Sequence, residues 1–223
     1  MAGAFILSGR VKRALLDALY PSGCVCPLCM AETRLGSDGL CGSCRAALRY
    51  CAAPVYAEPL DGLTAAFLYA DPARSAVLRL KYGKATYLAD FFAAHISIPD
   101  HWKIDCMIPV PLHWFRAFRR GYNQSEMIAQ ALSERDIGLP VRADLLRRIR
   151  ATPSQTNLDA TARRKNVRGA FAADPSVKGL SVLLIDDVVT THATLTACAA
   201  QLKKAGAVRV YAACACAAGE PRA

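Results

Sequence analysis

The chain has 223 residues, of which 53% are hydrophobic and 21% charged, and a formal net charge of +10. This length allows one well-buried domain with a small appendage and excludes two full-sized enzyme domains. No run approaches the roughly 20 apolar residues of a membrane-spanning helix, so membrane insertion is not expected. The positive charge favours anionic partners, either a phosphorylated small molecule or nucleic acid, unless it serves solubility alone.

The N-terminal residues carry apolar side chains at a spacing nearer to a helix than to a signal peptide, at Phe5, Leu7, Val11, Leu15 and Leu19. They lack a charged start followed by a continuous apolar run and a small-residue cleavage site. We therefore expect a short amphipathic helix that stays in the mature chain, and a cytoplasmic protein.

Six of the ten cysteines crowd the first quarter of the chain, and four of them form two CxxC pairs, Cys26 with Cys29 and Cys41 with Cys44. Each pair can offer two thiolates for tetrahedral coordination, so we predict a Zn²⁺ site. Because four thiolates leave no open position, this metal is expected to be structural. The alternative, a disulfide framework, suits exported domains.

The other cysteines leave part of the ligand set open. Cys24 is an alternative ligand to Cys26, and Cys51 is either a spare thiol or part of a second knuckle. The remaining four lie in apolar runs, where a thiol behaves as a small hydrophobic side chain. We expect these in the core: Cys106, Cys198, Cys214 and Cys216.

From about residue 61 the chain alternates helical and strand-like runs, after a linker over 52–59. The alternation predicts an α/β domain over 59–223, with a mainly parallel sheet flanked by helices, after a helix and zinc-knuckle module over 1–58. Helices are expected over 72–95 with a break at 82–83, over 125–134, and over 194–205 with Gly206 as the cap. Strands are expected over 105–111, 182–185 and 208–216, with a loop after the first.

The run VLLIDDVVTTHAT over 182–194 places two acids after an aliphatic strand, and then a hydroxyl-rich turn that opens a helix. Strand ends in such sheets are ligand sites. Backbone N–H groups at a helix start can bind a phosphate dianion, and the carboxylates can accept hydrogen bonds from ribose hydroxyls or hold Mg²⁺. The candidate binding residues are Asp186, Asp187, Thr190, Thr191, His192, Ala193 and Thr194.

The segment DDVVTTHAT resembles the DDVxTTGxT signature of type I phosphoribosyltransferases at every defined position except the glycine, which is His192 here. The resemblance implies that the loop binds 5-phosphoribosyl 1-pyrophosphate (PRPP). Glycine at this point would allow a close approach to phosphate or a positive φ, and histidine costs space or of order 1 kcal/mol of strain. We therefore hypothesise that His192 weakens the affinity for PRPP, although a histidinium could itself contact phosphate.

Two basic segments, over 109–124 and 155–171, precede the strand expected over 182–185. With the CxxC pairs, they resemble the ComF (GntX-like) competence-protein family, in which a zinc finger precedes a phosphoribosyltransferase-type domain, over nearly the whole chain. By this resemblance the first segment lies where these folds bind pyrophosphate, and the second forms a flexible hood loop over the site. The implied contacts to pyrophosphate or nucleic acid are Arg116, Arg119, Arg120, Arg163, Arg164 and Lys165.

Aromatic residues alternate with arginines in the first basic segment, at Trp114, Phe115, Phe118 and Tyr122. This composition is typical of surfaces on which single-stranded DNA stacks its bases. The alternative is that the rings pack beneath the loop and the arginines form a solvated face. For Tyr122 and for Phe171 we expect core packing.

Two functions of different classes remain. The first is a PRPP-binding protein that serves competence and the uptake or processing of transforming DNA, with single-stranded DNA and competence proteins as partners, as the family resemblance implies. The second is an active phosphoribosyltransferase that transfers ribose 5-phosphate from PRPP to a base or amine. The basic residues would then neutralise the departing pyrophosphate, and no catalytic acid or base can be named. A fold alone does not establish transfer chemistry.

Overall fold

The computed structural model describes residues 25–51, 56, 58–150 and 167–219. The chain divides into two compact units, Met1–Ala47 and Leu48–Ala223. The expected division at residues 58–59 stays a prediction, and the N-terminal amphipathic helix lies outside the described residues. Within the described part, every helix is too short or too polar to cross a bilayer.

Four parallel strands form the sheet of the second unit, in the order β1 (Gly62–Leu68), β6 (Arg209–Ala217), β5 (Ser181–Val189) and β2 (Cys106–Pro109). The expected mainly parallel sheet is thus confirmed. β5 is buried along nearly its whole length because it has a neighbour on each side and helices on both faces. Its Ile185 pairs with Pro109 of β2 and with Ala213 of β6, so the chain leaves these strands at one edge of the sheet.

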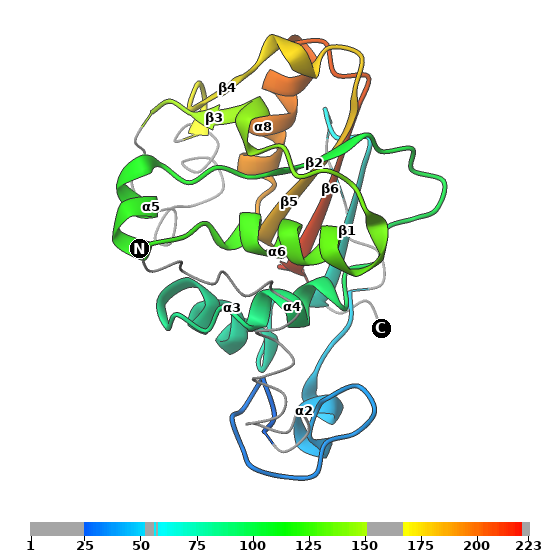
Figure 1. Cartoon of the computed structure of the whole chain (residues 1–223), viewed down its shortest axis with the longest axis vertical. Helices are drawn as coiled ribbons and strands as arrows, with labels where there is room; N and C mark the ends of the chain where they lie inside the picture. The colour runs from blue at the N-terminus through cyan, green and yellow to red at the C-terminus, as the bar shows by residue number, and fades with distance from the viewer. Residues whose placement is uncertain (1–24, 52–55, 57, 151–166, 220–223) are drawn as a thin grey trace, which may run out of the picture. The chain divides into compact units, whose positions relative to one another are not determined.

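Three helices cover one face of this sheet (Figure 1): α3 (Ala73–Tyr82), α4 (Leu88–Ala93) and α6 (Gln124–Leu132). α6 packs on β5 and β2, and α4 packs against α6. The expected break at 82–83 is confirmed, since α3 ends at Gly83, where a Cβ would come within 3.0 Å of the Arg79 carbonyl oxygen. α6 continues into a π-helical turn over Ser133–Ile137.

The opposite face carries α8 (Ala193–Lys204) and an antiparallel pair of strands, β3 (Leu146–Arg148) and β4 (Phe171–Ala173). Strand residues alternate between the two faces, so Val182 and Leu184 join the cluster that includes α8 and buried Phe171. Gly206 follows α8 as expected, and its N–H donates to Lys203 O. Two short 3₁₀ turns complete this side, Ala143–Leu145 and Pro175–Val177.

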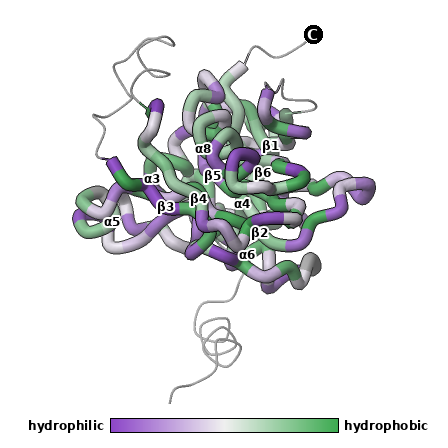
Figure 2. The backbone as a smooth tube through the Cα atoms, turned by 90° about the horizontal axis from the view of Figure 1, so that it is seen from above, coloured by the Kyte–Doolittle hydropathy of each residue, from purple (hydrophilic) through white to green (hydrophobic). Residues whose placement is uncertain are grey.

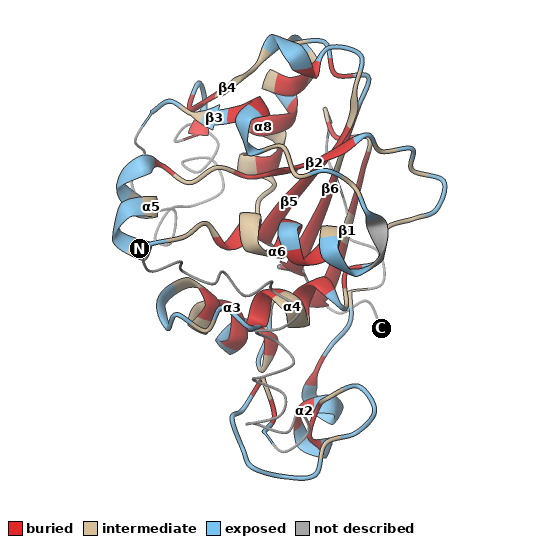
Figure 3. Ribbon diagram, viewed as in Figure 1, coloured by how far each residue is buried: buried red, intermediate tan, exposed pale blue. Residues whose placement is uncertain are grey.

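The core of the second unit lies between the sheet and these helices. Figure 2 shows apolar residues gathered along the strands and the packed helices, and Figure 3 shows the strands of the four-stranded sheet largely buried. Four cysteines expected in the core are buried there, which confirms that expectation: Cys106, Cys198, Cys214 and Cys216.

The segment after β2 corrects the sequence analysis, because Trp114–Arg120 form a helix, α5, where a loop was expected. His113 begins this helix, and its Nδ1 accepts a hydrogen bond from Phe115 N at 3.4 Å. Gly121 ends it with a φ of +83°, a left-handed conformation that glycine adopts without strain. These capping residues are the local signals that favour a helix over a loop.

Candidate functional site

Two buried carboxylates stand near the end of β5, Asp186 and Asp187, which are only 8% and 4% exposed. Ser125, in the first turn of α6, donates its hydroxyl to Asp186 Oδ1 at 3.1 Å, and Asp187 N donates to the same oxygen at 2.9 Å. Burial, followed by the charge of Asp187, raises the pKa of Asp186 to about 7. This carboxyl group therefore changes its charge near neutral pH.

Lys81, near the end of α3, contacts this acidic pair and was not singled out by the sequence analysis. Its Nζ lies 2.8 Å from Asp187 Oδ2, and its side chain is 20% exposed. Burial alone would lower the pKa of Lys81, but the negative charge of Asp187 raises that pKa overall. Because Asp187 Oδ2 accepts no well-aligned hydrogen bond from the described residues, the ion pair with Lys81 compensates its burial.

The β5–α8 loop holds the candidate phosphate-binding residues. Asp186 and residues 188–195 line a hollow of about 50 Å³ at the start of α8. The N-terminus of this 12-residue helix favours an anion in the hollow. His192 begins the helix with a φ of +60°, in the left-handed region, so the structure supports a positive φ as the reason for glycine in the related signature.

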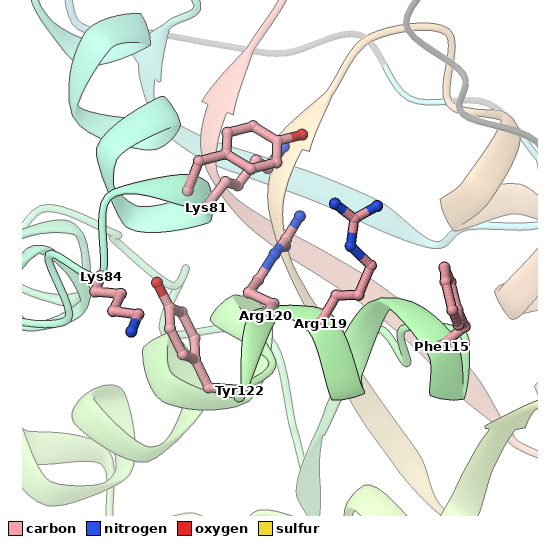
Figure 4. Close-up of a pocket in the computed structure, with 7 residues that line it drawn as sticks. Lys81, Lys84, Phe115, Arg119, Arg120 and Tyr122 are labelled. Atoms are coloured by element: carbon pink, nitrogen blue, oxygen red, sulfur yellow. The ribbon is translucent and has the colours of Figure 1, made fainter.

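A larger cavity, of about 400 Å³, lies between the end of α3 and α5 (Figure 4). Four basic and three aromatic side chains line it: Lys81, Lys84, Arg119, Arg120, Tyr82, Phe115 and Tyr122. Arg119 and Arg120 project from α5 into the space that Lys81 enters from α3. Among the described residues no acid lines this cavity, so its walls attract anions.

The candidate basic residues divide into two groups. Arg119 and Arg120 line the same cavity as Lys81, which itself contacts Asp187. These two arginines therefore lie near the acids of β5. The side chain of Arg116 and the whole of residues 163–165 lie outside what the structure describes. The roles of Arg116, Arg163, Arg164 and Lys165 therefore stay predictions.

The aromatic side chains of α5 face solvent. Trp114 and Phe118 are 71% and 84% exposed, and Phe115 is half exposed. Packing beneath the loop, the alternative given above, is therefore wrong for these three residues. Tyr122 is half-buried, and its hydroxyl donates to Leu80 O, which joins the turn between α5 and α6 to α3.

The first unit contains a candidate metal centre of four cysteines, Cys26, Cys29, Cys41 and Cys44, whose Sγ atoms all lie within 4.8 Å of one another. Cys29 Sγ and Cys41 Sγ are 3.7 Å apart. Thiolates bound tetrahedrally to Zn²⁺ at about 2.3 Å would be roughly 3.8 Å apart, so the cluster fits this ion.

Local structure supports this cysteine cluster. The helix α2 (Gly42–Ala47) carries Cys44, whose N–H donates to Cys41 Sγ at 3.4 Å. Hydrogen bonding to Ser43, and then to Cys44 N, lowers the pKa of Cys41 to about 6, whereas burial raises the pKa of Cys44 well above that of a free thiol. Cys51 is outside the cluster, in the second unit, and Cys24 lies outside the described residues.

Residues 89–223 match the family model of the phosphoribosyl transferase domain. This match covers more than half of the chain and includes α5, β5 and the β5–α8 loop. It begins after α3, so Lys81 lies outside the matched residues.

Two similar proteins come from bacteria. Competence protein F of Haemophilus influenzae is 30% identical over 191 residues, which cover 78% of this chain and 83% of that protein. DNA utilization protein YhgH of Escherichia coli (strain K12) is 28% identical over 224 residues, which cover 86% of this chain and 96% of that protein. Among solved structures, glutamine PRPP amidotransferase from B. subtilis is 22% identical over 58% of this chain and 25% of that chain, with a TM-score of 0.38, too weak a likeness for any inference.

Proposed function

The chain belongs to the ComF family of proteins with a phosphoribosyltransferase domain, and on this premise we propose that its β5–α8 loop binds PRPP or a related phosphoribosyl ligand. We propose further that this binding serves the uptake or processing of transforming DNA, as the names of the relatives suggest. The observation that carries the proposal is the pair of buried acids beside a hollow at the N-terminus of α8.

In this proposal each part of PRPP has its own partner. The 5-phosphate binds the helix start at residues 190–194, and Asp186 and Asp187 accept hydrogen bonds from the ribose hydroxyls. The cavity beside α5 takes the pyrophosphate, with Arg119 and Arg120 as its cations. Mg²⁺, if bound, would be held by the carboxylates and the pyrophosphate, and its charge would offset that of the ligand.

Titration calorimetry with PRPP and Mg²⁺ tests this proposal. We expect Asp186→Asn to weaken binding at least about tenfold, because an amide replaces a charged acceptor for the ribose hydroxyls. Asp105→Asn is the matched control, since Asp105 precedes β2 at the opposite end of the same sheet, where its Oδ2 accepts from Ser181 N. Equal affinities of Asp186→Asn and the wild type, or no binding by the wild type, would refute the assignment.

Binding of single-stranded DNA is a second function that one observation favours, namely the exposure of Trp114, Phe115 and Phe118 on the helix that carries Arg119 and Arg120. Exposed rings can stack on bases while guanidinium groups neutralise phosphates. This function is compatible with PRPP binding on one scaffold, because Trp114 and Phe118 are exposed whereas the acids of β5 are buried; Phe115, Arg119 and Arg120 line the proposed pyrophosphate cavity and would be shared.

Gel shifts at several salt concentrations test DNA binding. We expect the affinity to fall steeply with salt and to drop when Arg119 and Arg120 are both changed to alanine. Arg209→Ala removes a similar charge at the start of β6, at the far end of the sheet, and should have little effect. Asp186→Asn should also leave DNA binding unchanged. If no shift occurs at moderate salt, only a role through competence-protein partners survives.

Transfer of ribose 5-phosphate to a base or amine is the alternative enzymatic function. The basic cavity supports it to the extent that cations there would stabilise departing pyrophosphate. Its test is the release of pyrophosphate from PRPP across candidate acceptors. Release that depends on one acceptor and is lost in Asp186→Asn would establish the enzyme, and no release with any acceptor would favour a binding protein.

We propose that the four-cysteine cluster holds structural Zn²⁺. Elemental analysis of freshly purified protein should give about one equivalent, because four thiolates in one tetrahedral site bind one ion. Cys29→Ser should reduce this content, whereas Cys106→Ser, in the core of the second unit, should leave it unchanged. Less than about half an equivalent in the wild type would contradict the site.

A further inference from the structure

We propose that Lys81 couples the two halves of the ligand site, because it contacts Asp187 and also lines the 400 Å³ cavity proposed for the pyrophosphate. Binding of the phosphoribosyl group would then depend on binding of a pyrophosphate-type anion. The inference rests on the proposed function and adds a positioning residue to it. Lys81 precedes residues 89–223, so the family match by itself assigns it no role.

The position of Lys81 is held by its neighbours in the fold. The hydroxyl of Tyr122 donates to the carbonyl oxygen of Leu80, the residue before Lys81. α3 ends at Tyr82, the residue after Lys81, and Gly83 caps it. From this place the ammonium group lies 2.8 Å from Asp187 Oδ2, and the same side chain lines the cavity with Arg119 and Arg120 (Figure 4). Since an ammonium group has three N–H donors, Lys81 can donate both to Asp187 and to an anion bound in the cavity.

The charges around Lys81 make these two contacts interdependent. Without a ligand, Lys81 compensates the buried oxygen of Asp187, so a ribose hydroxyl must compete with it for that carboxylate. An anion in the cavity attracts Lys81 and lowers this competition, which leaves Asp187 available to the ribose. Two anionic ligands alone would repel each other, so a positive coupling between them requires a cation that both sites share, either Lys81 or Mg²⁺. At fixed Mg²⁺, the Lys81→Met variant separates these two sources.

Lys84 supplies a matched control for this relay. It lines the same cavity and carries the same charge, but within the described residues it forms no ion pair with the acids of β5. Loss of Lys84 should therefore weaken anion binding without breaking the connection to Asp187. Loss of Lys81 should do both.

The first experiment uses the wild-type full chain and two small probes. Ribose 5-phosphate is titrated by calorimetry at fixed Mg²⁺, with and without saturating inorganic pyrophosphate. We expect pyrophosphate to tighten the binding of ribose 5-phosphate by about tenfold, a coupling of the size common between linked sites. If ribose 5-phosphate binds equally well with and without pyrophosphate, the role of Lys81 is overturned while the proposed function stands. If the wild type binds neither these probes nor PRPP, the proposed function itself fails.

The second experiment repeats the titration on three variants whose folding is checked by thermal unfolding. Lys81→Met should abolish the coupling, Lys81→Arg should largely keep it, and Lys84→Met should keep it while binding pyrophosphate more weakly. A coupling that survives in Lys81→Met, or that is lost equally in Lys84→Met, would overturn the inference. If Lys81→Met does not fold, Lys81→Gln replaces it, because the amide can still donate to Asp187 without the charge.

Discussion

The end of β5 and the helix after β2 lie at the same edge of the sheet, but their candidate ligand-binding side chains differ in exposure to solvent. The acids of β5 are buried, and each has a partner from another element, Ser125 for Asp186 and Lys81 for Asp187. The rings of Trp114 and Phe118 on α5 are exposed. A buried polar site needs partners of fixed geometry, whereas an exposed surface can accept varied ones.

This difference indicates how one domain can serve two kinds of ligand. Buried acids whose charge is already compensated suit one small ligand whose hydroxyls match them. Exposed aromatic and basic side chains suit a polymer whose bases and phosphates repeat without a fixed register. Changes to Trp114 and Phe118 should therefore leave PRPP binding unaffected, and changes to Asp186 should leave DNA binding unaffected, whereas Arg119 and Arg120 serve both ligands.

The largest expected effect comes from removing the exposed rings of α5. The double change Trp114→Ala and Phe118→Ala should weaken single-stranded DNA binding by roughly 30-fold or more, since each stacked base contributes about 1–3 kcal/mol. Thermal stability and PRPP affinity should stay near wild type, because both rings are mostly exposed. Fluorescence anisotropy measures the DNA affinity, with exposed Tyr50→Ala as the control. Loss of PRPP binding in the double variant would break the separation of the two regions.

The pH dependence of PRPP binding should have the next largest effect. The pKa of Asp186 is raised to about 7, so its carboxyl group is largely protonated at pH 6 and largely ionised at pH 8. The ionised form is the better acceptor for ribose hydroxyls, and PRPP affinity should therefore rise with pH over this range by up to about tenfold. Calorimetry at constant ionic strength measures this change.

The control for this pH profile is Asp186→Asn, which removes the titrating group. Because a phosphate monoester also titrates near pH 6, any slope that remains in the variant belongs to the ligand. An identical slope in the variant and the wild type would contradict the role of Asp186. DNA affinity should change little over the same range.

The smallest expected effect is that of His192→Gly. Glycine has no side chain to obstruct the approach of phosphate, so PRPP affinity should rise by about fivefold, the equivalent of about 1 kcal/mol. The φ of +60° is present without ligand, so relief of its strain should appear as higher thermal stability instead. His192→Ala separates the two causes, since it removes the imidazole but keeps the strained backbone. If His192→Gly binds PRPP no better than the wild type, the histidine is not the source of weakened affinity.

Features fixed by local sequence were predictable in this chain. The aliphatic run of β5, the glycine after α8 and the break near residue 83 each depend on residues close together in the sequence. The spacing of the cysteine pairs likewise predicted their cluster. α5 was missed because it has only seven residues, too few for a clear apolar period, and its signals are single residues at its ends, His113 and Gly121.

Features that depend on tertiary packing were not predictable. The helix that carries Lys81 was expected, but no periodic pattern indicates that its end reaches the acids of β5. The pairing of β3 with β4 joins segments on either side of residues 151–166 and follows from no local turn signal. The acids themselves were found from the sequence, and their partners Lys81 and Ser125 required the structure.

The distribution of thiols between the two units has a practical consequence. Burial raises the pKa of Cys198 and of Cys214 well above that of a free thiol, so these core thiols are unreactive while the second unit is folded. The cluster thiols become reactive as soon as a bound metal leaves. In a background that carries Cys24→Ser and Cys51→Ser, a colorimetric thiol reagent would therefore distinguish metal loss from melting of the sheet in a single unfolding experiment.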